Sequence, residues 1–148
     1  MKKLLLGSDH AGFHLKQELK AFLKNKKIPF QDLGPKTYNP KDDYPDFAKL
    51  VAKKVIKNKT KGVLICGNAE GICIAANKIK GARAAVLYDN YTAKTSRLDD
   101  NANIACLRGR KFPHKKATKI LLTFLKTKFS NKQRHKRRIK QIKKLETK

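Results

Sequence analysis

Short apolar runs alternate with amphipathic helical stretches along this chain, and that alternation limits the folds it can adopt. A buried strand needs only a few consecutive apolar residues, whereas a covering helix repeats its apolar residues every three or four positions. The pattern predicts strands at 3–7, 28–33, 62–65, 83–87 and 103–107. It predicts helices at about 11–26, from residue 46 onward, and at 71–80, 91–98, 113–128 and 131–145.

Strands that alternate with helices favour a parallel sheet with helices on both faces. The sequence therefore predicts an α/β fold: a three-layer, doubly wound, Rossmann-like sheet of five mainly parallel strands, with an extra basic helix at the C-terminal end. Its 148 residues suit one domain, which we expect to span 1–148. In such folds ligands bind at the carboxyl ends of the strands. We expect residues 8–12, 66–71 and 99–103 to meet there.

The final helix, at about 131–146, differs from the others in its charge. Residues 115–148 hold 14 of the 37 basic residues and one of the 11 acids. Its apolar residues Ile139, Ile142 and Leu145 recur on one side, and such a stripe needs a surface to cover it. We expect a partner subunit to supply that surface.

A formal net charge of +26 raises the question of nucleic-acid binding. The excess of lysine is spread through the whole chain, and the basic tail contains no aromatic residue beyond Phe129. The sequence also lacks zinc-finger spacing and an aromatic platform of the kind that stacks RNA bases. We therefore expect no nucleic-acid partner.

The three cysteines, Cys66, Cys73 and Cys106, form no CxxC pair and are odd in number. This argues against a disulfide framework or a structural zinc site, and it suits a reducing cytosol. No apolar run approaches the ~20 residues of a membrane span. We expect a cytoplasmic protein without a membrane partner, and neither a metal nor another cofactor.

The segment Cys66–Gly71 lies between a predicted strand and a predicted helix. Backbone N–H groups in such a turn, together with the helix N-terminus, favour an anion or a developing oxyanion and activate a nearby thiol. From the residues alone, a small buried cysteine at a strand end is an equally good interpretation.

Two further sets of residues could act on a phosphorylated ligand. Asp9 and His10 follow the first strand and could transfer protons or bind phosphate, although a helix-capping Asp beside a surface His is the more ordinary case. In the last helix, Arg134, Arg137 and Arg138 with His135 could grip phosphate oxygens, although a solvated basic face is the simpler interpretation.

Six segments taken together resemble the type B ribose-5-phosphate isomerase family, which also includes galactose-6-phosphate isomerase subunits. The resemblance spans nearly the whole chain in order, and CGxxxGxxIAANK with SDHAG is not a general Rossmann pattern. The matching segments are GSDHAG (7–12), DYPDFA (43–48), LICGNAEGICIAANKIKGARAA (64–85), TSRLDDNAN (95–103), GR (109–110) and RHKRR (134–138).

The resemblance implies an aldose–ketose isomerase that works through an enediolate without a metal. Cys66 would be the base between C1 and C2, the 67–71 turn would stabilise the enediolate, and Asp9 would assist at the sugar oxygens. The family site lies between two subunits, so the resemblance implies a homodimer, or a tetramer. The implied catalytic residues are Cys66, Asp9, Asp99 and Asn68, and the implied substrate-binding residues are His10, Tyr44, Gly67, Gly71, Asn101, Arg110, Arg134 and Arg138.

Three positions depart from the family pattern. Asn68 stands where Thr is common, Asp99 stands where many members have a ring-opening His, and Arg108 replaces a glycine. A carboxylate can also move protons, so Asp99 is expected to substitute for the His.

Three functions stay open on the sequence. The first is interconversion of ribose 5-phosphate and ribulose 5-phosphate in the pentose phosphate pathway. The second is isomerisation of a six-carbon sugar phosphate, galactose 6-phosphate or allose 6-phosphate. The third is a catalytically silent relative, either a structural partner subunit or a basic protein that binds nucleic acid.

Overall fold

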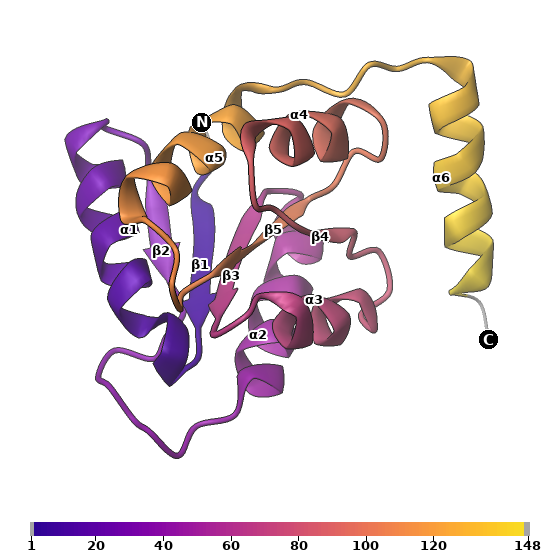
Figure 1. The fold of residues 1–148 in the computed structure, drawn as a ribbon. Coiled ribbons are helices and arrows are strands. Elements are labelled where there is room, and N and C mark those ends of the chain that lie inside the picture. Colours follow the sequence, from indigo (N-terminus) through magenta and orange to yellow (C-terminus); the bar gives the residue numbers. More distant parts are fainter. Residues whose placement is uncertain (1, 147–148) are drawn as a thin grey trace.

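Five parallel strands form the centre of the computed structural model, which describes residues 2–146. They lie in the order β2-β1-β3-β5-β4, and every neighbouring pair runs parallel (Figure 1). The prediction of a mainly parallel sheet is confirmed and extended, since no described strand is antiparallel. The strands are β1 (Leu4–Ser8), β2 (Phe30–Asp32), β3 (Gly62–Cys66), β4 (Ala84–Val86) and β5 (Ile104–Arg108).

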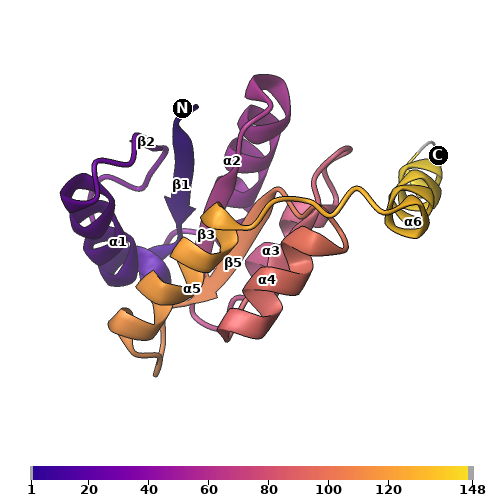
Figure 2. The ribbon, with the colours of Figure 1, turned by 90° about the horizontal axis from the view of Figure 1, so that it is seen from above.

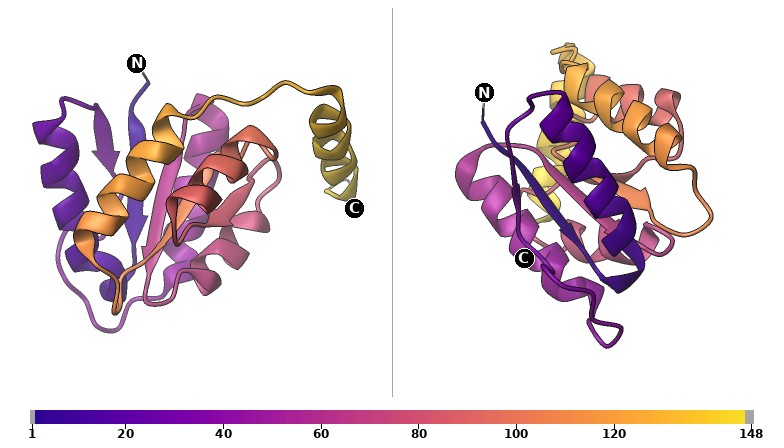
Figure 3. Two further views of the ribbon diagram at one scale, coloured as in Figure 1. Left: turned by 45° about the horizontal axis from the view of Figure 1, so that its top comes forward. Right: turned by 90° about the vertical axis from the view of Figure 1, so that its left-hand side faces the viewer.

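Helices cover both faces of this sheet, as Figure 2 and Figure 3 show. Neighbouring residues of a strand point to opposite faces. Leu4 and Leu6 therefore pack beneath one layer of helices, while Leu5 packs beneath the other. The first layer holds α1 (Phe13–Asn25), α4 (Asn90–Leu98) and α5 (His114–Lys126), and the second holds α2 (Tyr44–Asn58) and α3 (Glu70–Asn77).

Helix α2 begins earlier than the sequence indicated. It starts at Tyr44 rather than after Asp46, because Pro45 lies in the first turn, where its missing N–H costs no helical hydrogen bond. Tyr44 is therefore held on a helix and not on a loop. Within residues 2–146, no helix is long and apolar enough to cross a membrane.

The last helix, α6 (Gln133–Leu145), stands apart from the layers at the end of an extended link (Figure 1). It begins two residues later than predicted. Only His135 and Ile139 are buried, while Ile142 and Leu145 of the same stripe are 40% and 73% exposed.

The order of the strands fixes where a ligand can enter. From β1 the chain first adds β2 on one side, and later adds β3 on the other. In doubly wound sheets such a reversal opens a crevice beyond the carboxyl ends of the two central strands. Here that crevice lies where Ser8 and Ile65 pair at the ends of β1 and β3.

One predicted placement is wrong. Residues 99–103 precede β5, so they lie at the amino edge of the sheet and not at its carboxyl edge. The backbone oxygen of Asn103 accepts a hydrogen bond from Gly62 N, at the first residue of β3. Asp99 is therefore about the length of a strand away from the end that carries Cys66. The error arose because the segment was placed by its proximity to a strand in the sequence, without regard to the strand's direction.

A buried lysine ties α1 to the loop that crosses the carboxyl edge. The fully buried Lys16 donates to Asp32 Oδ1 at 2.7 Å and to the oxygen of Pro35, and Lys20 donates to Asp32 Oδ2. Burial opposes the charge on Asp32, but the bonds from Lys16 and Lys20 hold its pKa below the ordinary value. Burial also lowers the pKa of Lys16, while the hydrogen bond to Asp32 and the charge of that carboxylate oppose the decrease.

Replacing Lys16 with Met should lower the free energy of unfolding by about 3 kcal/mol, because it removes one partner of a buried ion pair. Since the pKa of Asp32 is lowered in the fold, the stabilisation exists above its unfolded value of 3.8 and is lost as the pH falls. Urea unfolding at pH 7 measures the loss. Lys20→Met is the matched control: Lys20 is 31% exposed and should cost about 1 kcal/mol or less. Equal losses would contradict the assignment.

Candidate active site

Asp9 and His10 lie directly against the end of β3. Asp9 N donates to the oxygen of Ile65 at 3.2 Å, and the Asp9 carboxylate accepts from Gly12 N at 3.0 Å. The carboxylate thereby begins the 3-10 turn η1 (His10–Gly12). The sequence DHAG thus folds back on itself and keeps both polar side chains at the crevice between β1 and β3.

The turn after β3 places Cys66 next to Gly67, which lies against a cation. Cys66 is buried, and its backbone oxygen accepts from Gly109 N. Arg110 N donates to the oxygen of Gly67, and the Arg110 guanidinium covers that residue closely. A Cβ atom on Gly67 would stand 2.8 Å from Arg110 Nη1, so a larger residue would push the end of the arginine side chain away. The structure therefore places the predicted residue Arg110 against Gly67, the residue that follows Cys66.

Helix α3 begins at this turn with free backbone N–H groups. Its N-cap, Ala69, has φ +72°, and no side chain caps the helix. The first-turn N–H groups can therefore stabilise negative charge at the crevice. The Tyr44 ring packs directly against Gly71 in this first turn. A Cβ atom on Gly71 would stand 2.5 Å from Tyr44 Cε1. Asn68 is exposed at the same turn.

Asp9 is suited to proton transfer. Burial raises the pKa of its carboxyl, and the nearby charge of Asp42 adds to the increase, while the hydrogen bond from Gly12 and the charge of His10 oppose it. A carboxyl whose pKa is raised toward neutrality exchanges protons more readily with a sugar oxygen.

A carboxylate that the sequence reasoning missed orients His10. Asp42 Oδ1 accepts from His10 N at 2.9 Å and lies 2.7 Å from His10 Nδ1. With Nδ1 bound to Asp42, Nε2 stays available to a ligand. Asp42 comes from the 34–43 loop, and sequence alone gave no signal that this loop crosses the sheet to reach His10.

The second oxygen of Asp42 has no partner. Asp42 Oδ2 and Ser8 Oγ are both buried, and neither has a hydrogen-bond partner among residues 2–146. Buried polar atoms are usually satisfied, so a polar ligand in the crevice would complete them. No group of three or more His, Cys, Asp or Glu side chains in the same described range is arranged to hold a metal ion.

The amino-acid sequence is similar to those of known proteins. The family model described as "Ribose/Galactose Isomerase" matches residues 4–142. The "Probable ribose-5-phosphate isomerase B" of Mycoplasma genitalium is 46% identical over 141 residues, which cover 94% of this chain and 92% of that protein.

Solved structures agree over the whole chain. The ribose-5-phosphate isomerase B of M. genitalium, solved with bound ribulose-5-phosphate, superimposes with a TM-score of 0.93 at 44% identity and covers 99% of this chain and 97% of that one. The Thermotoga maritima enzyme gives a TM-score of 0.92 at 39% identity, covering 96% of this chain and 97% of that one. This chain belongs to the ribose/galactose isomerase family.

The site of this family member contains only part of the predicted set. One chain brings eight predicted residues to the carboxyl edge: Asp9, His10, Tyr44, Cys66, Gly67, Asn68, Gly71 and Arg110. Four predicted residues lie elsewhere, at the amino edge or on α6: Asp99, Asn101, Arg134 and Arg138.

Three of the four distant residues interact with other residues of the amino edge or of α6. Asp99 Oδ1 lies 3.7 Å from His135 Nε2 on α6, and Asp99 remains 48% exposed. Asn101 accepts from Arg97 and Arg83. The Arg138 charge also lowers the pKa of Asp100, although burial and Asp99 raise that pKa overall.

Changing Asp42 to Asn should release the His10 ring, because the amide is a weaker acceptor for Nδ1–H. Nitrogen-15 NMR of the imidazole should show one tautomer, protonated at Nδ1, in the native protein and a mixture of tautomers in the variant. Asp43→Asn is the control, since Asp43 is exposed and makes no capping bond. The same spectrum for Asp42→Asn and the native protein would show that Asp42 does not orient the ring.

Proposed function

We propose that this protein interconverts ribose 5-phosphate and ribulose 5-phosphate, as the pentose phosphate pathway requires. The observation that carries the proposal is that Cys66, buried at the end of β3, precedes the uncapped N-terminus of α3, while Asp9 N donates to Ile65 O one residue before Cys66. The related M. genitalium enzyme holds ribulose-5-phosphate and covers 99% of this chain. The three free cysteines suit a cytoplasmic setting.

The reaction needs one base and one group that holds the oxyanion. Cys66, as thiolate, removes the proton from C2 of the open-chain aldose and returns it to C1, which gives the ketose. Between these steps the enediolate oxygen is held by the backbone N–H groups of the 67–71 turn. Asp9 exchanges the proton between the sugar oxygens and assists ring opening, and Tyr44 lines the sugar pocket.

The phosphate group of the substrate needs cations around it. A single chain brings only some of the proposed cations to the crevice. His10 and Arg110 are present at the carboxyl edge, whereas Arg134 and Arg138 lie on α6. The exposed Ile142 and Leu145 of α6 need a cover. We propose that α6 of a second copy packs beside the crevice, so that a homodimer, alone or within a tetramer, completes each site.

In this arrangement Asp99 also reaches the site of the partner. It would act there as the ring-opening group, in place of the histidine found in many relatives. Its 48% exposure leaves the carboxylate accessible to a substrate on a second subunit.

The description of the family names galactose as well as ribose. A six-carbon sugar phosphate is therefore the second candidate substrate. Competition assays with allose 6-phosphate and galactose 6-phosphate against ribose 5-phosphate separate the two. A higher kcat/KM for either six-carbon sugar would replace the pentose as the substrate.

Cys66→Ala should abolish turnover of ribose 5-phosphate, with a loss of about 10³-fold or more in kcat, because no other group in the crevice replaces the base. A coupled assay of ribulose 5-phosphate formation measures the loss. Cys73→Ala is the matched control, since Cys73 is also a buried free cysteine and should retain activity within about twofold. An inactive but folded native protein would instead favour a catalytically silent relative.

Mixing two inactive variants tests the shared site. Cys66→Ala and Arg138→Ala subunits, unfolded and refolded together, should regain about a quarter of native activity, because half of the dimers then contain one intact site. Each variant refolded alone stays inactive. A mixture without activity would place Cys66 and Arg138 in the same subunit's site.

A further inference from the structure

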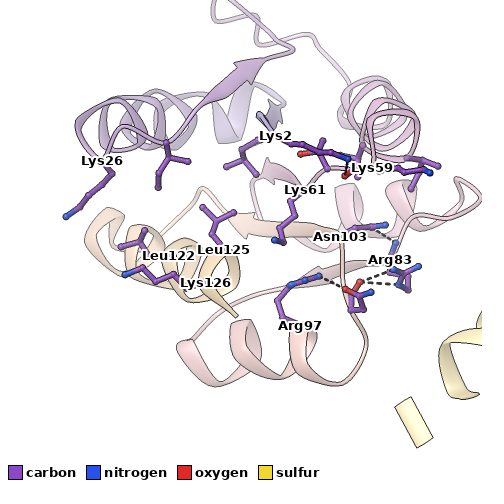
Figure 4. A pocket seen from close by; sticks show the side chains of 16 residues that line it. Lys2, Lys26, Lys59, Lys61, Arg83, Arg97, Asn103, Leu122, Leu125 and Lys126 are labelled. Carbon is purple, nitrogen blue, oxygen red and sulfur yellow. Dashed lines mark hydrogen bonds between the residues drawn. The ribbon is translucent and has the colours of Figure 1, made fainter. Parts of the chain in front are cut away.

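The amino edge of the sheet contains a cavity of about 890 Å³, which is within the usual range for small-molecule sites. It lies at the opposite end of the sheet from Cys66, since its lining includes Leu4 at the start of β1 and Lys61 just before β3. No step of the proposed isomerisation uses it. Figure 4 shows its side chains from close by.

Aliphatic side chains form one part of this cavity. Leu4 and Val55 come from β1 and α2 and are buried, while Leu122 and Leu125 come from α5 and are partly exposed. Ile28, next to the start of β2, extends the same surface. An apolar body of moderate size can therefore be removed from water here.

Cations surround the apolar part, and none of the residues that line the cavity is acidic. Lys26, Lys59 and Lys126 lie at the ends of α1, α2 and α5, where a positive charge complements the helix dipole. These three lysines need no ligand to explain them. Arg97 likewise lies in the last turn of α4, whereas Lys61 directly precedes β3 and lies at no helix end, so the helix dipole does not explain it.

Lys61 and Arg97 are two cations that face each other without a carboxylate. Burial lowers the pKa of the Lys61 ammonium, and the charge of Arg97 lowers it further, while no acid opposes either effect. Figure 4 shows Lys61 extending into the cavity toward Arg97. Two cations held together in this way are destabilising until an anion neutralises them.

The Arg97 guanidinium also retains N–H groups that could donate hydrogen bonds to a ligand. It is buried, and it donates from Nε to Thr127 O and from Nη1 to Asn101 Oδ1 and Ala102 O. These bonds fix the plane of the guanidinium. Its Nη2 donates to none of residues 2–146, so two N–H groups remain, beside the three of Lys61.

We propose that this amino-edge cavity binds a phosphate monoester with an apolar body, its dianionic phosphate between Lys61 and Arg97 and its body against Leu4, Leu122 and Leu125. Two positive charges match the two negative charges of the phosphate, and an arginine fork suits its oxygens. The aliphatic lining selects esters with an apolar group over inorganic phosphate. The body could be a nucleobase or an alkyl chain, and two probes separate these sources.

Calorimetric titration of the native protein with adenosine 5′-monophosphate and with decyl phosphate tests the proposal. Saturating ribose 5-phosphate is present, so that the carboxyl-edge crevice is occupied. We expect one of the two esters to bind with one equivalent per chain, and inorganic phosphate to bind at least about tenfold more weakly. Binding of neither ester, or equally tight binding of inorganic phosphate, would overturn the proposal.

A matched pair of variants locates the binding. Lys61→Gln removes the central charge and should weaken the ester about tenfold or more, whereas Lys57→Gln removes an exposed charge outside the cavity and should leave the affinity within about twofold. Equal losses in the two variants would mean nonspecific attraction to a basic surface.

The thermal midpoint separates binding from a structural role of Lys61. Because Lys61 and Arg97 repel each other, Lys61→Gln should unfold at the same or a higher temperature when no ester is present. A lower midpoint together with unchanged ester affinity would make Lys61 a structural residue and overturn the proposal.

Discussion

The pairing of β1 with β3 is the contact on which the rest of the site depends. The register that sets Ser8 beside Ile65 also lets Asp9 N donate to Ile65 O, so the turn after one strand is built on the end of the other. The thiol, the carboxyl and the imidazole then share one crevice, although 57 positions separate Asp9 from Cys66 in the sequence. The strand order creates that crevice, and the loop from β2 to α2 closes it with Asp42.

Local pattern predicted the fold well because each strand and helix has a clear apolar signature. The runs around Leu5 and Leu64 are too short and too continuous for a helix, and the spacing of Leu15, Leu19 and Leu23 fits only a helix. Strand direction and the paths of loops have no such signature. Asp99 was therefore assigned to the wrong edge of the sheet, although its segment had been recognised.

The residues of the crevice were predicted from the resemblance to a family. Those that follow β1 and β3 lie together within one chain. Asp42 was missed because its role depends on the path of a loop and not on a motif around it. Arg134 and Arg138 were identified from a short basic segment, yet they stand on a helix that leaves the body of its own chain. In the proposed homodimer, their use at the crevice depends on the second subunit, which a single sequence does not describe.

The strand β3 joins both ends of the molecule. It starts beside Lys61 and ends at Cys66, and it is hydrogen-bonded along its length to β1 on one side and β5 on the other. A strand held on both sides cannot shift at one end without breaking bonds in two neighbours. The hydrogen bonds on both sides of β3 therefore fix the distance between the amino edge of the sheet and the carboxyl edge that carries Cys66.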